Sequence, residues 1–124
     1  MTTSEYITNK KVKDIKNGDK NIDIQVILIK KIDEHNIKNG GCITTFLVGD
    51  ESGSINCNFY ENVSPFIKDG DVLYITGAFA SLFDNKIVLY QPKAGYGFVK
   101  KIKEFFFQFS LEPNISENQQ KINK

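Results

Sequence analysis

Short runs of β-prone residues, separated by turn residues, constrain the fold of this chain more than any other feature. The first run, residues 22–29, alternates apolar and polar residues and then becomes continuously apolar. This pattern is typical of a strand that passes from a half-exposed to a fully buried setting. Further runs cover residues 42–49, 54–60, 72–83 and 87–91. Their spacing predicts an all-β domain, either a small barrel or a sandwich.

The segments between these runs carry the turn residues. A polar stretch from Asp33 to Gly41 predicts a long first loop, and residues 50–53, which end in glycine, predict a tight hairpin. Residues 61–67 contain a proline and are expected to cross one end of the barrel as a short segment. Gly77, in the middle of the fourth run, predicts a bulge or bend that would help a small barrel to close.

This order of elements predicts a five-stranded OB-fold, a Greek-key barrel with a short crossing segment between its third and fourth strands. The expected domain covers residues 11–111, between an N-terminal tail of residues 1–10 and a polar, disordered C-terminal tail of residues 112–124. Residues 98–109 are apolar with a basic insert, and periodicity leaves a closing strand and a short helix open.

The charge of the chain argues against base-specific reading of a duplex. All basic residues are lysines, and lysine lacks the planar fork with which arginine reads guanine. The net charge is only +1, but residues 84–103 hold five lysines and one aspartate. Such a basic stripe can attract a phosphate backbone, although a lysine cluster taken alone more often marks a solvated face.

The sequence offers no group that predicts an enzyme, a metal site or a cofactor. Cys42 and Cys57 lack a CxxC spacing and neighbouring histidines, so no zinc site is expected. His35, the only histidine, lies in the polar first loop, where a solvated side chain is favoured over a general base. Asp50 and Glu51 are interpreted as turn formers. No apolar run approaches the ~18 residues of a membrane span.

Four aromatic residues are candidates for stacking on nucleic-acid bases. Strand alternation places Phe79 and Phe83 on one face, Tyr60 falls on the polar face of its strand, and Tyr90 lies near the end of the last predicted strand. Stacking gains ~1–3 kcal/mol per base and tolerates any base. The alternative is that both phenylalanines are core residues. The lysines expected to contact phosphates are Lys31, Lys38, Lys86 and Lys93.

Several ordered motifs resemble the SOSS-B family, the simple eukaryotic OB-fold proteins that bind DNA in the sensor of single-stranded DNA (SOSS) complex. The hairpin from Gly49 to Asn56, GDESGSIN, and the following Tyr60-Glu61-Asn62-Val63 carry the strongest likeness. Further matches lie at residues 13–16, 69–72, 79–83, 101–105 and 112–117. The resemblance implies an OB-fold, with the family's stacking aromatics at Tyr60, Phe79, Phe83 and Tyr90.

The resemblance also implies partners and a location. Members of that family act in nuclear DNA repair and the DNA damage response, together with a large helical scaffold subunit shared with the Integrator complex, and the motif around Glu104 and Phe105 resembles their scaffold-facing segment. We therefore expect a nuclear protein that binds single-stranded DNA. Two alternatives stay open, namely binding of single-stranded RNA and a protein-interaction module without strong nucleic-acid binding.

Overall fold

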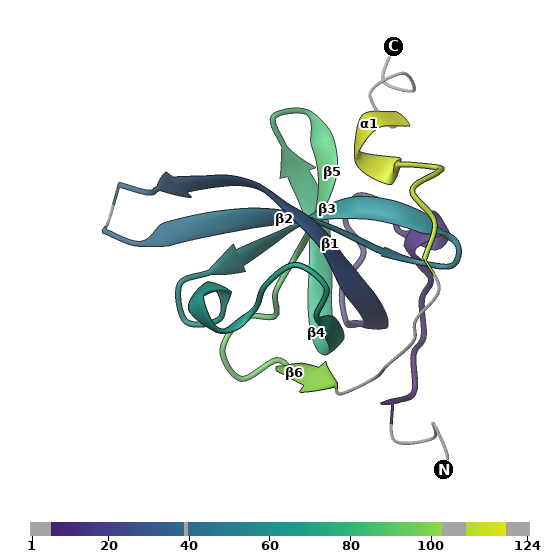
Figure 1. The fold of residues 1–124 in the computed structure, drawn as a ribbon, viewed down its shortest axis with the longest axis horizontal. Coiled ribbons are helices and arrows are strands. Elements are labelled where there is room, and N and C mark those ends of the chain that lie inside the picture. Colours follow the sequence, from purple (N-terminus) through teal and green to yellow (C-terminus); the bar gives the residue numbers. More distant parts are fainter. Residues whose placement is uncertain (1–5, 39, 103–108, 119–124) are drawn as a thin grey trace.

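The computed structural model describes residues 6–38, 40–102 and 109–118, and their main feature is one six-stranded sheet (Figure 1). Its strands are β1 (Ile22–Asn36), β2 (Cys42–Asp50), β3 (Gly53–Tyr60), β4 (Val72–Phe83), β5 (Lys86–Tyr90) and β6 (Val99–Ile102). The short helices are η2 (Val12–Asp14), η3 (Ser64–Phe66) and α1 (Ile115–Asn118). Because η3 lies between β3 and β4, it corresponds to the crossing segment predicted there.

The sheet closes into a barrel because β1 pairs with two neighbours. The strand order is β1-β2-β3-β5-β4-β6, and β1 also pairs with β4. Residues 22–27 of β1 face β4, whereas residues 27–36 face β2, and two register shifts bend the strand between Leu28 and Asp33. The β3–β5 pair is parallel and the other pairs are antiparallel. This topology confirms the predicted all-β OB-fold barrel.

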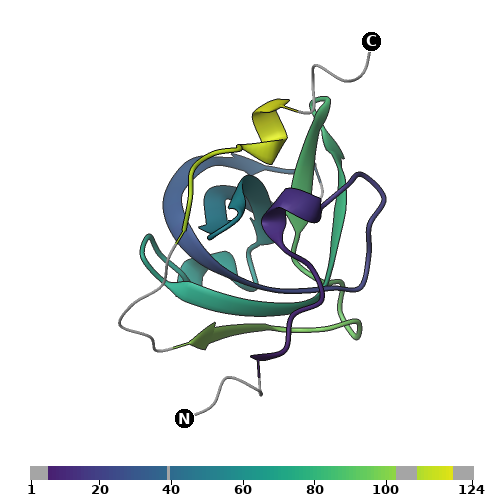
Figure 2. The same cartoon turned by 90° about the vertical axis from the view of Figure 1, so that its right-hand side faces the viewer.

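The core fills the inside of this barrel, as the alternation of apolar residues predicts. Ile24, Leu28, Phe59, Leu73 and Leu89 are all fully buried there. The short helix η2 contributes a residue to the same core, and in Figure 2 it is the purple turn in front of the ring of strands. Side chains that alternate with the core residues point to the outer face of the sheet.

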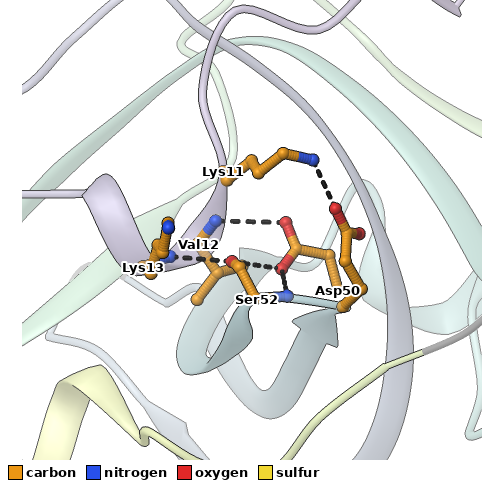
Figure 3. Close-up of polar contacts among 6 residues, drawn as sticks. Lys11, Val12, Lys13, Asp50 and Ser52 are labelled. Carbon is orange, nitrogen blue, oxygen red and sulfur yellow. Dashed lines mark hydrogen bonds and ion pairs between the residues drawn. The ribbon is translucent and has the colours of Figure 1, made fainter.

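The hairpin between β2 and β3 holds η2 against the barrel (Figure 3). The buried carboxylate of Asp50 accepts a hydrogen bond from the backbone N–H of Val12 at 3.1 Å. Its other oxygen accepts from the backbone N–H and the hydroxyl of Ser52, at 2.8 and 2.6 Å. The Ser52 hydroxyl in turn accepts from the Lys13 backbone N–H at 3.0 Å. Asp50 is therefore a structural residue of the turn.

The first loop is much shorter than the sequence indicates. Strand β1 continues to Asn36, and its last residues pair with β2 in a hairpin that projects from the barrel on the left of Figure 1. The prediction of a loop from Asp33 onward was wrong because the exposed, polar residues at the end of β1 still pair their backbone with the buried strand β2.

Near the C-terminal end of the chain, the structure resolves part of what the sequence left open. The open choice for residues 98–109 resolves as a strand at its start, where β6 pairs with β4. Glu104 and Phe105, the expected partner-binding residues, lie outside the described residues.

Packing against the barrel continues beyond the predicted boundary at Leu111. Ile115 and Ser116 are buried, and the Ser116 hydroxyl donates to the Ile87 carbonyl at 2.8 Å and accepts from the Asn56 N–H at 2.9 Å. It thus bridges β3 and β5 beside the point where their pairing starts. At the other end, the Tyr74 hydroxyl donates to the Ile7 carbonyl at 2.6 Å, so residues before 11 contact the barrel as well.

Candidate nucleic-acid interface

One cross-strand row of side chains crosses the outer face of the sheet. Phe79 on β4 is opposite Tyr90 on β5, Tyr90 is opposite Asn58 on β3, and Asn58 is opposite Thr45 on β2. The core takes Cys57, Phe59 and Leu89 from the same strands, so the alternating residues of the row must lie on the opposite face. Four strands therefore place two aromatic and two polar side chains side by side.

The two aromatic residues of the row stack on each other. The ring centroids of Phe79 and Tyr90 are 5.1 Å apart and their planes differ by 4°. Both rings are half-buried, and neither belongs to the hydrophobic core. The pKa of the Tyr90 phenol is raised above its usual value, mainly because the group is partly buried. The Asn58 amide lowers this pKa and the Tyr60 phenol raises it, so both groups lie near the Tyr90 hydroxyl.

Phe83 is also half-buried and outside the core, and it stacks on a residue that we had not expected at the site. The ring of His35 on β1 lies 5.7 Å from that of Phe83, at an interplanar angle of 17°. The interpretation of His35 as a solvated loop residue was wrong, because it belongs to a strand and faces another ring. His35 pairs with Ile43 of β2, and this pairing could be predicted only if the hairpin was known to extend to Asn36.

Tyr60 lies on the same face of β3 as Asn58, beside a cavity of about 490 Å³. Its backbone N–H donates to the side-chain oxygen of the buried Gln91 at 2.7 Å, which fixes the end of β3 against the chain that follows β5. The ring of Tyr60 is half-buried. All four predicted aromatic residues therefore lie on the outer side of the barrel, and their role in binding stays a prediction.

Of the four predicted lysines, only Lys93 has its ammonium group over a ring of this face. Its Nζ lies 5.4 Å from the centroid of Phe79, a distance at which a cation is attracted to an aromatic ring. Lys86 pairs with Glu117 at 3.0 Å, and Lys31 pairs with Glu34 at 3.2 Å. Lys38 is exposed near the turn of the β1–β2 hairpin. The predicted lysines are thus spread around the face.

A cavity of about 470 Å³ continues the face beyond Phe79. Lys20, Lys93 and Tyr96 contribute to its walls, and Tyr96 is 71% exposed. The loop that carries Tyr96 approaches β4 closely: a Cβ at Gly77 would lie 2.0 Å from the Tyr96 carbonyl oxygen. Gly77 has a φ of +75°, so it allows both the backbone turn and the close approach. Sequence patterns gave no signal for Lys20 or Tyr96.

The cysteines and carboxylates do not converge on a common point. Cys57 is buried in the core, where burial raises the pKa of its thiol, and Cys42 lies on the β1–β2 hairpin. Among the described residues, no group of three histidine, cysteine, aspartate or glutamate side chains is placed to hold a metal ion. Within the same residues, no helix is long and apolar enough to cross a membrane.

No protein-family model matches the sequence. Among solved structures, the barrel is similar to a hypothetical protein from Arabidopsis thaliana, with a TM-score of 0.69 and 18% identity over 94% of this chain and 88% of that chain. It is also similar to the second OB-fold domain of replication protein A from Methanococcus maripaludis. That match has a TM-score of 0.60 and 16% identity over 79% of this chain and 98% of that chain. Topology and structural likeness together show that this chain is an OB-fold barrel.

Proposed function

We propose that this chain binds single-stranded DNA by stacking bases on the outer face of its barrel. The observation that carries the proposal is the stacked pair of Phe79 and Tyr90, which lies outside the core with the Lys93 ammonium group over the Phe79 ring. OB-fold barrels bind oligonucleotides across the outer face of their second and third strands. Here Thr45 on β2 and Asn58 on β3 continue that face to Tyr90 on β5. Base stacking of ~1–3 kcal/mol for each ring would supply the affinity.

The chemistry of the face favours a single strand over a duplex. Rings can stack only on base faces, and these are accessible where bases are not paired with a second strand. Lysine side chains contact phosphates as point charges and do not read base edges in a groove. The resulting interaction is tolerant of sequence, and its affinity falls as the salt concentration rises.

The finer part of the proposal is that the chain acts as the DNA-binding subunit of a SOSS-like complex in the nucleus, in the DNA damage response. Its support is the ordered set of sequence motifs, above all the hairpin from Gly49 to Asn56. In that complex, Glu104 and Phe105 would contact the large helical scaffold subunit. Co-purification of that scaffold with the wild-type chain, and its loss in a Glu104→Ala, Phe105→Ala variant, would test this part.

Two other ligand classes remain alternatives. Single-stranded RNA offers the same base faces and phosphates, and a stacking surface does not by itself exclude the 2′-hydroxyl. Competition between DNA and RNA oligonucleotides of matched sequence decides between them. A module that only binds proteins is the second alternative, and it predicts no binding of either oligonucleotide.

Fluorescence anisotropy with labelled oligo-dT, and with duplex DNA of equal length, tests the proposal. We expect binding of the single strand, weaker binding of the duplex, and a steep loss of single-strand affinity between low and high salt. The variant Phe79→Ala, Phe83→Ala, Tyr90→Ala should lose at least tenfold in affinity. Phe66→Ala removes a 71% exposed ring on η3 and is the matched control. Unchanged affinity in a folded triple variant would refute the proposal.

A further inference from the structure

Asn58 is a buried polar residue on the outer face, and only one of the two polar atoms of its side-chain amide is paired within the described residues. The side chain is fully buried, although it lies outside the hydrophobic core. Its Oδ1 accepts a hydrogen bond from the Thr45 hydroxyl at 2.5 Å. Its Nδ2 has no hydrogen-bond partner among the residues that the structure describes. Within this part of the chain, one donor on this face therefore has no hydrogen-bond partner.

The contact with Thr45 fixes the orientation of the amide. A separation of 2.5 Å lies within the range of O–H···O hydrogen bonds but below that of N–H···O bonds, so the oxygen of Asn58 faces Thr45. Nδ2 must then point away from β2, towards β5, where Tyr90 is the register partner of Asn58. The amide is near enough to lower the pKa of the Tyr90 phenol, yet this phenol does not meet the geometry of a hydrogen bond to Nδ2.

An unpaired buried donor is unfavourable. The amide N–H loses its bonds to water on burial, and a donor left without a partner destabilises a folded protein. The nearby Leu47 and Val88, which are buried on the same face and outside the core, show that apolar side chains are accommodated here. The donor therefore has the properties of a group that is paired in another state of the protein.

The stacking of the rings indicates what that state is. One face of Tyr90 is covered by Phe79, and Phe79 is flanked by Lys93 on the segment that follows β5. The face of Tyr90 that remains for a base is the one towards β3, and Asn58 lies on β3 in register with Tyr90. A base stacked on that face directs one of its edges towards the floor of the sheet, where Nδ2 is oriented to meet it.

We propose that Asn58 donates a hydrogen bond from Nδ2 to a carbonyl oxygen of a pyrimidine base stacked on Tyr90. The proposal rests on the proposed function and adds a preference to an otherwise sequence-tolerant surface. Because Asn58 is fully buried in the free protein, its side chain has to become accessible as the base enters. The base carbonyl then satisfies Nδ2, while Thr45 keeps Oδ1 in place.

The test compares oligo-dT with the same oligonucleotide carrying difluorotoluene in place of a single thymine, at each position in turn. Difluorotoluene has the shape of thymine and stacks, but its fluorine atoms are poor hydrogen-bond acceptors. For the wild-type protein we expect one position at which the replacement weakens binding about threefold to tenfold, as the loss of one hydrogen bond implies. Asn58→Leu should bind both oligonucleotides equally.

Asn56→Leu is the matched control, because Asn56 lies two residues earlier on the same face of β3 and is half-buried. This variant should keep the wild-type discrimination. Asn58→Leu could fail to fold because the Thr45 hydroxyl loses its hydrogen-bond acceptor. In that case the double variant Thr45→Val, Asn58→Leu, which removes both partners, is used in its place. Equal binding of both oligonucleotides at every position by the wild-type protein overturns the inference while the proposed function stands. Absence of binding to oligo-dT itself refutes the proposed function instead.

Discussion

The ring of His35 stacks on the ring of Phe83 and so joins two hairpins of the barrel, with centroids 5.7 Å apart. His35 is carried by the β1–β2 hairpin and Phe83 by the β4–β5 hairpin, which lie far apart in the sequence. One face of Phe83 is therefore occupied in the free protein. A base that stacks on this face has to displace the imidazole.

We expect His35→Ala to bind oligo-dT about twofold to tenfold more tightly than the wild-type protein. The removed ring pair is worth ~0.5–1.5 kcal/mol, which a base no longer has to overcome. Anisotropy titrations at one salt concentration measure the change. Glu34→Ala, the preceding exposed residue of β1, is the control for altered charge on this hairpin. Weaker binding by His35→Ala would show instead that the imidazole contacts the ligand.

Asp50→Ala should lower the free energy of unfolding by about 2–3 kcal/mol. The carboxylate accepts hydrogen bonds from Val12 and Ser52 in a buried setting, and its loss leaves the Val12 N–H without a partner. Urea unfolding followed by circular dichroism measures this. Oligo-dT affinity should be unchanged in the folded fraction, because Asp50 lies at the end of β2 and Thr45, the β2 residue of the outer row, lies five positions earlier. A change below 0.5 kcal/mol, on the order of an ordinary surface substitution, would contradict this role.

The acid stability of the protein should depend on Asp71. Burial alone would raise the pKa of this carboxyl, but the Lys68 backbone N–H and the ammonium groups of Lys68 and Lys101 outweigh it and lower the pKa below its usual value. A lowered pKa in the folded state stabilises the protein above the unfolded pKa near 4, and this contribution is lost as the pH falls through the folded value.

Asp71→Asn should therefore be about 1–2 kcal/mol less stable than the wild-type protein at pH 7, as expected for lost charged hydrogen bonds. The difference should shrink as the pH falls from about 4 through the lowered pKa of the folded carboxyl, below which the wild-type side chain is also neutral. Thermal unfolding at a series of pH values checks this. Glu61→Gln, which neutralises an exposed carboxylate just after β3, is the matched control. A difference that is independent of pH would contradict the assigned cause.

Gly77→Ala should destabilise the barrel and displace the loop that carries Tyr96. The added methyl group would lie 2.0 Å from the Tyr96 carbonyl oxygen, in a backbone conformation with φ of +75° that favours glycine. We expect a loss of at least about 2 kcal/mol in unfolding free energy. Gly70→Ala is a matched control, because it has a φ of +92° but no atom within 4 Å of the added carbon. Equal losses in both variants would mean that the backbone conformation alone, and not the loop contact, is responsible.

The strands could be predicted from sequence because alternation records which face each residue occupies. This was enough to place Phe79 and Phe83 on one face, but it did not decide between the core and the outer side. The contact of Phe79 with Tyr90 additionally depends on the register of a hairpin, and that of Tyr90 with Asn58 on a parallel pair between strands distant in sequence. Neither register has a local signature. The pairing of Tyr90 with Asn58 was therefore beyond sequence patterns.

The remaining differences have one physical cause, namely that polar residues conceal ordered structure. The end of β1 is polar and was taken for a loop, which hid the position of His35. The C-terminal segment is polar around Ile115, and the single apolar residue that enters the core gave too little pattern to be noticed. In both segments, backbone hydrogen bonds to the barrel supply the order that hydrophobic periodicity does not reveal.

The bridge that Ser116 forms between β3 and β5 has a consequence for how the barrel opens. These two strands share only three register pairs, so their pairing is a short contact in the closed barrel. The Ser116 hydroxyl forms hydrogen bonds to β3 and to β5, next to the first of these pairs. Slow hydrogen exchange at the backbone N–H of Asn56 therefore reports whether β3 and β5 are paired. In a shortened chain that ends before residue 112, these two strands should separate first.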